Sequence, residues 1–353
     1  MSITNKKSNN FWLKLKKTPS NSPHSAVAQG RLFRKGVGAR QPILALAPMA
    51  GITDSAFRQI CKKYGADVVY TEMISADGLH YDSKKTLAML DFDKSERPVV
   101  IQLFGKDPSK FTKAAELAQQ AGYSGIDINF GCPAKKVAGH GGGVTLMRDL
   151  NKCRQIIEAV LAGTTLPVSV KLRTSIKKGA ETMTALDFIK TVIDLPIAAY
   201  MIHGRPYENP FAAEIDYEMI RVCVKFIKTK NPQIVVLGNG GINTPEDAKK
   251  MMELTGVDGV GLARGLYGRP YLFDQIKKYF QTGRIPEYDK KKVKQAILLH
   301  AKLAARTKDV HGLVELRKHL LWYVKGWPNA KDLRSELVKV ENLKQVKEIL
   351  KTA

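Results

Sequence analysis

The segment Gly125-Ile-Asp-Ile-Asn-Phe-Gly-Cys-Pro-Ala-Lys-Lys-Val137 contains one unit of the pattern that decides the fold. Its first part, Gly125 to Asn129, alternates small, apolar and polar residues, which is typical of the end of a buried strand. Gly131 and Pro133 then end the strand and force a turn. Cys132 lies between them, so we expect its thiol at the carboxyl end of the strand.

This unit recurs from Pro42 to about Tyr271. Strand-like apolar runs occur at Ile43–Met49, Val68–Ile74, Pro98–Phe104, Ile126–Phe130, Pro167–Leu172, Ala198–Ile202, Ile234–Leu237 and Val257–Leu262. Helix-like segments lie between most of them, at Asp54–Tyr64, Pro108–Ala121, Asn151–Leu161, Thr184–Ile193, Asp216–Lys230 and Thr244–Leu254. This alternation predicts an α/β protein with a closed (β/α)8 TIM barrel. A doubly wound sheet is the alternative, but it usually needs fewer strands.

Active sites of such barrels are built at the carboxyl ends of the strands. In this chain those ends carry polar, charged or glycine-containing sequence: Pro48-Met49-Ala50, Glu72, Gln102, Asn129 with Cys132, Lys171 with Arg173, His203 with Arg205, Asn239-Gly240-Gly241 and Ala263-Arg264-Gly265. Any one of these residues could be a solvated surface group. A complete ring of them at one rim predicts a functional site.

The ends of the last two strands point to a phosphate. Barrels often bind phosphate after strands seven and eight, through loop amides and a helix N-terminus. The glycines there allow close approach of the backbone, and Arg264 supplies charge. Alternatively, the glycines only make tight turns. Neither a G-x-G-x-x-G after a strand nor a Walker lysine is present, which argues against a Rossmann-bound dinucleotide or a P-loop nucleotide.

Cysteine usage and hydropathy limit the possible environments of the chain. Its four cysteines, at positions 61, 132, 153 and 223, form no C-x-x-C pair, so neither a zinc cluster nor a disulfide framework is indicated. Cys132 could therefore be a small apolar filler or a reactive thiol. No apolar run approaches the roughly 18–20 residues that span a bilayer, and no secretion signal is evident. We expect a cytoplasmic protein without a metal or a membrane partner.

The charge of the chain is unusual. The chain has 353 residues, of which 57 are basic and 33 acidic, and its net charge is +24. Such an excess predicts attraction to polyanions such as nucleic acid or a phosphorylated cofactor. Residues 1–40 are basic and contain no acidic residue, which predicts a disordered extension. It could also be an arm that touches phosphates, or a transit peptide, although lysine outnumbers arginine there.

The pattern changes to helices alone beyond about Ile285. We divide the chain into this extension, a barrel over residues 41–284 and a small all-helical C-terminal domain over 285–353. Helical spacing predicts helices at Lys290–Thr307, His311–Lys325 and Arg334–Leu350. In the second of these, Trp322 and Tyr323 could fill the core of a small bundle or stack on nucleic-acid bases.

Six motifs together resemble the flavin-dependent tRNA-dihydrouridine synthases. They are Pro48-Met-Ala-Gly-Ile-Thr-Asp54, Asp127-x-Asn-x-Gly-Cys-Pro-x-x-Lys136, Val170-Lys-x-Arg173, His203-Gly-Arg205, Gly238-Asn-Gly240 and Ala263-Arg264. The resemblance covers roughly Pro42 to Tyr323. The helical tail, with Arg317-Lys-His319 and Trp322-Tyr323, is similar to the bacterial B-type branch. The resemblance implies an FMN-bound barrel followed by a helical RNA-binding domain.

Carried over by position, the resemblance assigns FMN to Pro48, Met49, Ala50, Gln102, Lys171, His203, Asn239, Gly240, Gly241, Ala263 and Arg264. Cys132 matches the catalytic cysteine of the family. Candidate substrate or RNA contacts are Asn129, Arg173, Arg205, Arg317, Lys318 and Tyr323. Gly241 departs from the family pattern, in which aspartate is common, and Ala263 stands where glycine is usual.

The implied reaction reduces the C5–C6 double bond of specific uridines in tRNA to 5,6-dihydrouridine. Reduced flavin offers a hydride from N5 to C6, and NADPH or NADH then re-reduces the flavin. The other carbon needs an acid, and a thiol with a pKa near 8.5 is mostly protonated at neutral pH. We therefore expect Cys132 to deliver the proton to C5, and Lys171 to stabilise the anionic reduced flavin near N1 and O2. The target base must leave its stack to reach the barrel.

Two rival functions remain open at the level of sequence. One is an FMN barrel dehydrogenase acting on free pyrimidines, of the dihydroorotate or dihydropyrimidine type, against which the net charge argues. The other is an RNA-binding module without catalysis, which would have no use for Lys171, His203 and Arg264. The sequence does not tell tRNA from rRNA as the target. It also leaves the oligomeric state open, and we expect a monomer.

Overall fold

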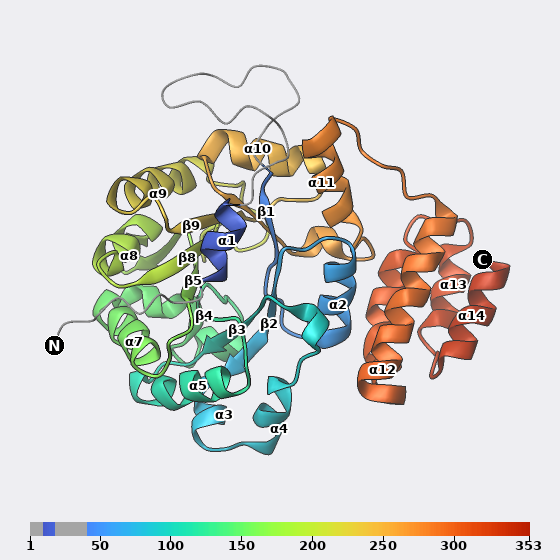
Figure 1. Ribbon diagram of the computed structural model, residues 1–353, viewed down its shortest axis with the longest axis horizontal. Coiled ribbons are helices and arrows are strands. Elements are labelled where there is room, and N and C mark those ends of the chain that lie inside the picture. The colour runs from blue at the N-terminus through green and yellow to red at the C-terminus, as the bar shows by residue number, and fades with distance from the viewer. Residues whose placement is uncertain (1–9, 18–40) are drawn as a thin grey trace.

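Eight parallel strands close into a barrel in the computed structural model, which describes residues 10–17 and 41–353 (Figure 1). The strands are β1 (Ile43–Leu46), β2 (Val68–Ser75), β3 (Val99–Phe104), β4 (Gly125–Phe130), β5 (Val168–Arg173), β8 (Ile197–His203), β9 (Val235–Asn239) and β10 (Gly259–Leu262). They pair in the order β1-β10-β9-β8-β5-β4-β3-β2. The predicted barrel and all eight predicted strand positions are therefore confirmed.

The helices between these strands form the outer layer. They are α2 (Ser55–Lys63), α5 (Pro108–Gln120), α7 (Leu150–Ala162), α8 (Ala185–Val192), α9 (Tyr217–Lys230), α10 (Pro245–Thr255) and α11 (Leu272–Thr282). Several begin at caps visible in the sequence. Thr244 accepts a hydrogen bond from the Asp247 amide in a capping box, and Pro245 occupies the first turn of α10. The first six match predicted helices, and α11 was not predicted.

Two connections differ from a simple barrel. After β2 the chain forms α3 (Ala76–His80), α4 (Lys84–Leu87), η1 (Ala88–Leu90) and η2 (Lys94–Glu96), where the sequence showed no clear pattern. After β5 it forms an antiparallel hairpin of β6 (Ser175–Lys178) and β7 (Glu181–Thr184). Cys132 lies in the loop between β4 and α6 (Lys135–Ala138), and η3 (Gly143–Arg148) follows α6.

A short N-terminal helix, α1 (Phe11–Lys17), closes the amino-terminal end of the barrel (Figure 1). Trp12 is fully buried against residues that include Val68 and Val235, each at the start of its strand. Lys16 donates to the carbonyl of Pro232, just before β9. The prediction of a disordered extension is therefore wrong for Phe11–Lys17, because the rings of Phe11 and Trp12 pack into the amino-terminal end of the barrel. The rest of the predicted extension lies outside the described residues.

The C-terminal region is entirely helical, as predicted. It contains α12 (Lys290–Tyr323), α13 (Ala330–Leu337) and α14 (Leu343–Thr352), and α12 packs against α2 of the barrel (Figure 1). The chain reverses direction within α12. The rings of His300 and His319 lie 4.9 Å apart, whereas a straight helix would separate these residues by about 28 Å.

The reversal lies between Ala304 and Gly312. A side chain at Gly312 would approach the Ala304 carbonyl oxygen to 2.1 Å, so only glycine fits at this turn. The two predicted helices on either side of residues 308–310 are thus two arms of a helical hairpin. The predicted domain boundary at residue 285 lies between α11 and α12.

The burial of Trp12 yields a stability prediction. We expect Trp12→Ala to lower the free energy of unfolding by about 3–5 kcal/mol, because it empties a fully buried site at the barrel end. Chemical denaturation followed by circular dichroism measures this loss. Leu13→Ala, at a half-buried position of the same helix, should cost less. Equal unfolding midpoints for Trp12→Ala and the unchanged protein would contradict the docking of α1.

Candidate active site

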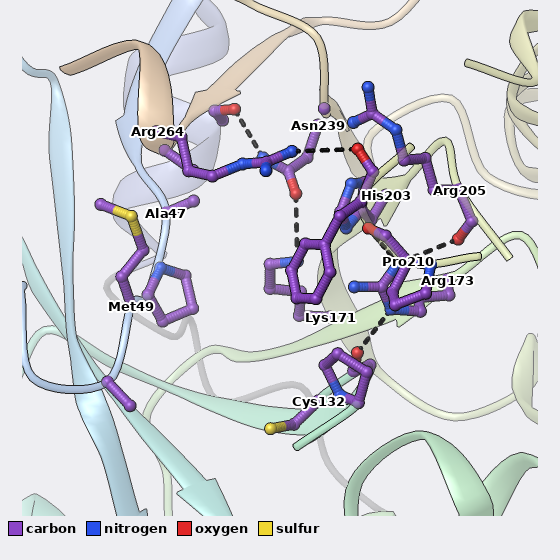
Figure 2. A pocket seen from close by; sticks show the side chains of 18 of the residues that line it. Ala47, Met49, Cys132, Lys171, Arg173, His203, Arg205, Pro210, Asn239 and Arg264 are labelled. Carbon is purple, nitrogen blue, oxygen red and sulfur yellow. Dashed lines mark hydrogen bonds between the residues drawn. The ribbon is translucent and has the colours of Figure 1, made fainter. Parts of the chain in front are cut away.

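A cavity of about 860 Å³ lies at the carboxyl ends of the barrel strands (Figure 2). All eleven residues that the resemblance assigned to FMN line it: Pro48, Met49, Ala50, Gln102, Lys171, His203, Asn239, Gly240, Gly241, Ala263 and Arg264. Cys132, Asn129, Arg173 and Arg205 line it as well. The structure therefore brings together residues that are up to 216 positions apart in the chain, from Pro48 to Arg264.

The register of the strands explains this convergence. Asn129 is paired with Lys171, Arg173 with His203, and His203 with Asn239 across neighbouring strands. Paired residues of parallel strands face the same side of the sheet. The polar residues thus form a continuous band around one end of the barrel.

Cys132 is held through its backbone. The amides of Gly131 and Cys132 donate to Asn129 Oδ1 over 3.0 and 2.8 Å, and the Val144 amide donates to the Cys132 carbonyl over 3.2 Å. A side chain at Gly143, whose φ is +60°, would come within 2.8 Å of that carbonyl oxygen. The glycine cluster after Cys132 therefore permits close packing beneath the cysteine.

The Cys132 thiol is the accessible one. All four cysteines lie in the described ranges; Cys61, Cys153 and Cys223 are buried, and Cys132 is only partly so. Burial raises the pKa of the Cys132 thiol, and the nearby cations Arg173 and Lys171 only partly counteract this. The thiol is therefore protonated at neutral pH and available as an acid.

Lys171 lines the same cavity as Cys132, and its charge acts on the thiol (Figure 2). Its Nζ donates to Asn239 Oδ1 over 3.1 Å, and Asn239 Nδ2 donates to the Gly261 carbonyl over 2.7 Å. Burial and then the neighbouring Arg173 lower the pKa of Lys171 to about 8. The ammonium group is mostly charged at neutral pH, so it can stabilise a negative charge that develops within the cavity.

Arg173 has a different position from the one expected of an RNA contact. It is buried, and its Nε donates to the Gly131 carbonyl over 2.8 Å. Its Nη1 lies 3.3 to 3.4 Å from the carbonyls of Arg205, Pro206 and Pro210 (Figure 2). Arg173 thus ties the Cys132 loop to the loop after β8.

A positively charged corner follows strands β9 and β10. Gly240 and Gly241 both have positive φ, and a side chain at Gly240 would come within 2.7 Å of the His203 ring. Arg264 is exposed at this corner and contacts Phe211, with its guanidinium 5.4 Å from the ring centre. Among the described residues that line the cavity there is no Asp or Glu. The corner suits a phosphate, as the glycines and the cation predicted.

The three predicted RNA contacts in the helical domain, Arg317, Lys318 and Tyr323, are buried or half-buried. Tyr323 is buried, with its hydroxyl 3.3 Å from His300 Nδ1, so little of its side chain is exposed and its RNA contact stays a prediction. Arg317 is half-buried and donates from Nε to the Val340 carbonyl over 2.9 Å, which joins α12 to the connection between α13 and α14. Lys318 is half-buried as well, so its RNA contact stays a prediction.

A second cavity of about 640 Å³ adjoins the first, at the boundary between barrel and helical domain. Its lining includes the cations Arg264, Arg269, Lys290 and Lys325 and the aromatic residues Tyr267, Tyr271, Tyr288, Trp322, Tyr323 and Trp327. Tyr267 lines both cavities and stacks on Trp322, with ring centres 4.0 Å apart and planes at 4°. Tyr267 is not among the predicted site residues, because nothing in the sequence pairs it with a residue of the distant helical domain.

No group of three or more His, Cys, Asp or Glu side chains in residues 10–17 and 41–353 is arranged to hold a metal ion. In the same ranges, no helix has the length and apolar character needed to cross a bilayer.

Comparison with known proteins gives the family. The model of the family described as "Dihydrouridine synthase (Dus)" matches residues 45–353. The chain belongs to the dihydrouridine synthase family. The tRNA-dihydrouridine synthase B of Pseudomonas aeruginosa is 34% identical over 301 residues, which cover 85% of this chain and 89% of that protein. The probable tRNA-dihydrouridine synthase 1 of Synechocystis sp. is 32% identical, covering 87% and 85%.

The similarity to a solved structure is weaker. The old yellow enzyme homologue from Zymomonas mobilis has a TM-score of 0.49 and 12% identity, covering 71% of this chain and 92% of that one. At this level of similarity it adds nothing to the assignment.

The exposure of Cys132 yields a labelling prediction. Iodoacetamide should modify the native protein at a single cysteine, because the other three are buried. Its rate should keep rising with pH above 8.5, since the pKa of Cys132 is raised above its ordinary value and the thiolate is the reacting form. Intact-mass and peptide spectra measure both. Cys132→Ser should abolish labelling, and an adduct at Cys61, Cys153 or Cys223 would contradict the burial pattern.

Proposed function

We propose that this chain is an FMN-dependent tRNA-dihydrouridine synthase that uses NADPH or NADH as reductant. The observation that carries the proposal is that a protonated thiol, Cys132, and a half-buried ammonium, Lys171, line one large cavity at the carboxyl ends of the barrel strands. Family membership supplies the reaction class, and the relatives named above are tRNA-dihydrouridine synthases.

The cavity fits FMN in size and in chemistry. Its volume of about 860 Å³ lies in the range typical of sites for small ligands and cofactors. The glycines at 240 and 241 leave backbone where a side chain would meet His203 or Ile215, so a phosphate can approach closely. Arg264 supplies the opposing charge, and Lys171 and Asn239 would face the ring system. We assign the whole set of eleven predicted residues to FMN on this basis.

The chain's own residues then supply the proton and the charge. Bound reduced flavin supplies the hydride that C6 of the uracil receives. Cys132 donates its proton to C5, which is possible because burial keeps the thiol protonated. Lys171 stabilises the negative charge that would develop near the flavin ring system. Asn129 Oδ1 accepts hydrogen bonds from the backbone amides of Gly131 and Cys132, which fixes the position of the acid.

RNA reaches this site from the side of the helical domain. The target uridine must leave its stack, and a single-stranded loop of tRNA makes this inexpensive. The second cavity offers exposed cations, Lys290 and Lys325, beside the half-buried Trp322 and Trp327. Phosphates and bases bind such mixed basic and aromatic surfaces. These residues join Tyr323 and Arg317 as proposed RNA contacts, while Arg205 stays at the cavity rim.

The role of Cys132 is tested by substitution. Cys132→Ala should retain the yellow cofactor but lower single-turnover dihydrouridine formation by about 100-fold or more, because general acids contribute about 10²–10⁴-fold. Mass spectrometry of tRNA from a strain lacking endogenous dihydrouridine synthases measures the product. Cys223→Ala, at a buried position on α9, should keep product formation. Undiminished product with Cys132→Ala would remove this role.

The RNA surface is tested by charge removal. The double variant Lys290→Ala/Lys325→Ala should weaken tRNA binding and reduce the slope of log K against log salt by about one unit per lost phosphate contact. Filter binding over a salt series measures both. Lys347→Ala/Lys351→Ala removes the same charge from exposed positions of α14 and should leave the slope unchanged. An equal response of the two double variants would count against a specific surface.

A further inference from the structure

A chain of side-chain hydrogen bonds runs from the barrel interior to Cys132. Asp127 is fully buried and accepts from Gln102 Nε2 over 2.7 Å and from Ser169 Oγ over 2.7 Å. Gln102 Oε1 accepts from Asn129 Nδ2 over 2.8 Å. Asn129 Oδ1 in turn accepts from the Gly131 and Cys132 amides. Register pairing places Gln102, Asp127 and Ser169 side by side on neighbouring strands.

The direction of this chain is set at its inner end. An ionised carboxylate only accepts hydrogen bonds, so Gln102 must turn its NH₂ toward Asp127. Its carbonyl oxygen then faces Asn129, whose NH₂ must point back toward Gln102. The Asn129 oxygen is thereby left for the amides of the cysteine loop. Reversing either amide would set oxygen against oxygen at Asp127, or NH₂ against N–H at Cys132.

We propose that Asp127 is a positioning residue, whose carboxylate orients Gln102 and Asn129 and through them holds the backbone of Cys132 in place. The inference deepens the proposed function and rests on it, because Cys132 is the acid of that reaction. No other role is evident for Asp127, which does not line either cavity. The bonds to the carboxylate are charge-assisted and therefore about twice as strong as neutral ones.

The orientation also determines what the cavity offers to a ligand. The side-chain oxygens of both amides already accept hydrogen bonds within the protein. Gln102 Oε1 accepts from Asn129, and Asn129 Oδ1 accepts from the backbone amides of Gly131 and Cys132. Gln102 has one N–H left, and Asn129 Nδ2 has only a weak second acceptor, Met73 Sδ at 4.0 Å. Gln102 and Asn129 therefore present donors to the cavity, which suits the carbonyl oxygens of a uracil or of a flavin ring.

Protonation of Asp127 should weaken the arrangement. Burial raises the pKa of Asp127 to about 6, against the bonds from Gln102 and Ser169 and the charge of Lys171, which lower it. Tyr70 also faces the carboxylate, and its own pKa is well above the usual range, so it stays neutral. Asp127 is thus charged at pH 8 and neutral at pH 5. A neutral carboxyl can donate, and it no longer dictates the direction of Gln102.

The experiment compares the full-length protein with Asp127→Asn, whose amide can accept from or donate to Gln102. Iodoacetamide labelling of Cys132 in flavin-free protein reports the loop directly. We expect the variant to react about ten-fold faster at pH 8, the difference between a charged and a neutral hydrogen bond. The ratio of rates should fall toward one at pH 5, where both proteins carry a neutral group. A ratio of one at every pH, or a constant ratio, would overturn the proposal.

Single-turnover reduction of tRNA uridine gives the second measurement. The unchanged protein should lose rate as pH falls through about 6, where the pKa of Asp127 lies, and Asp127→Asn should lack this loss. Tyr70→Phe removes a hydroxyl from the same buried layer and should match the unchanged protein in both assays. Absence of product from the unchanged protein would refute the proposed function, whereas the labelling ratio would still test Asp127.

A third variant covers the case in which Asp127→Asn fails to fold. Ser169→Ala keeps the carboxylate but removes a bond that lowers its pKa. The loss of rate should then begin at a higher pH than in the unchanged protein. A loss at the same pH would overturn the proposal.

Discussion

Closure of the barrel is the constraint on which the rest of the structure depends. The first strand of the barrel pairs with the last, Ile43 beside Gly259 and Leu46 beside Leu262. This pairing joins segments that are more than 200 residues apart in the chain. A side chain at Gly259 would come within 2.1 Å of the Ile43 carbonyl, so this contact requires glycine. Once the ring is closed, alternation along each strand points every second side chain inward, and the carboxyl ends of the strands converge on one cavity.

Competition between burial and charge determines the chemistry of that cavity. Two cations, Arg173 and Lys171, act on Cys132 and would by themselves favour a thiolate. Burial is the larger effect, and the pKa of the thiol rises. The same burial lowers the pKa of Lys171 to about 8 without discharging it at neutral pH. One environment thus keeps an acid protonated beside a charged ammonium, which is the combination that protonation of an electron-rich carbon needs.

Sequence predicted the parts of this molecule that follow from local pattern. The alternation of strands and helices gave the barrel, and the strand exits gave the residues around the cavity, because both depend on periods of two and 3.6 residues. It could not give contacts that depend on distant partners. The burial of Trp12 requires an open barrel end to fill, and Arg173 faces carbonyls of a loop whose path no pattern specifies. Asp127 belongs to the Asp127–Lys136 motif and lies two residues before Asn129 on the same face of the strand, so strand alternation could have predicted its place beside Asn129.

The helical domain is joined to the barrel beside the cavity, and this position has a physical consequence. Gly268 has positive φ, and a side chain there would overlap the backbone at Trp322, so the β10 loop and the second arm of α12 are in direct backbone contact. Tyr267, the residue before Gly268, lines the first cavity and stacks on Trp322. RNA bound to the helical domain, as proposed above, would therefore lie within one aromatic pair of the cavity. A domain tethered only by the linker between α11 and α12 would leave that distance undefined, whereas this contact fixes it before any RNA binds.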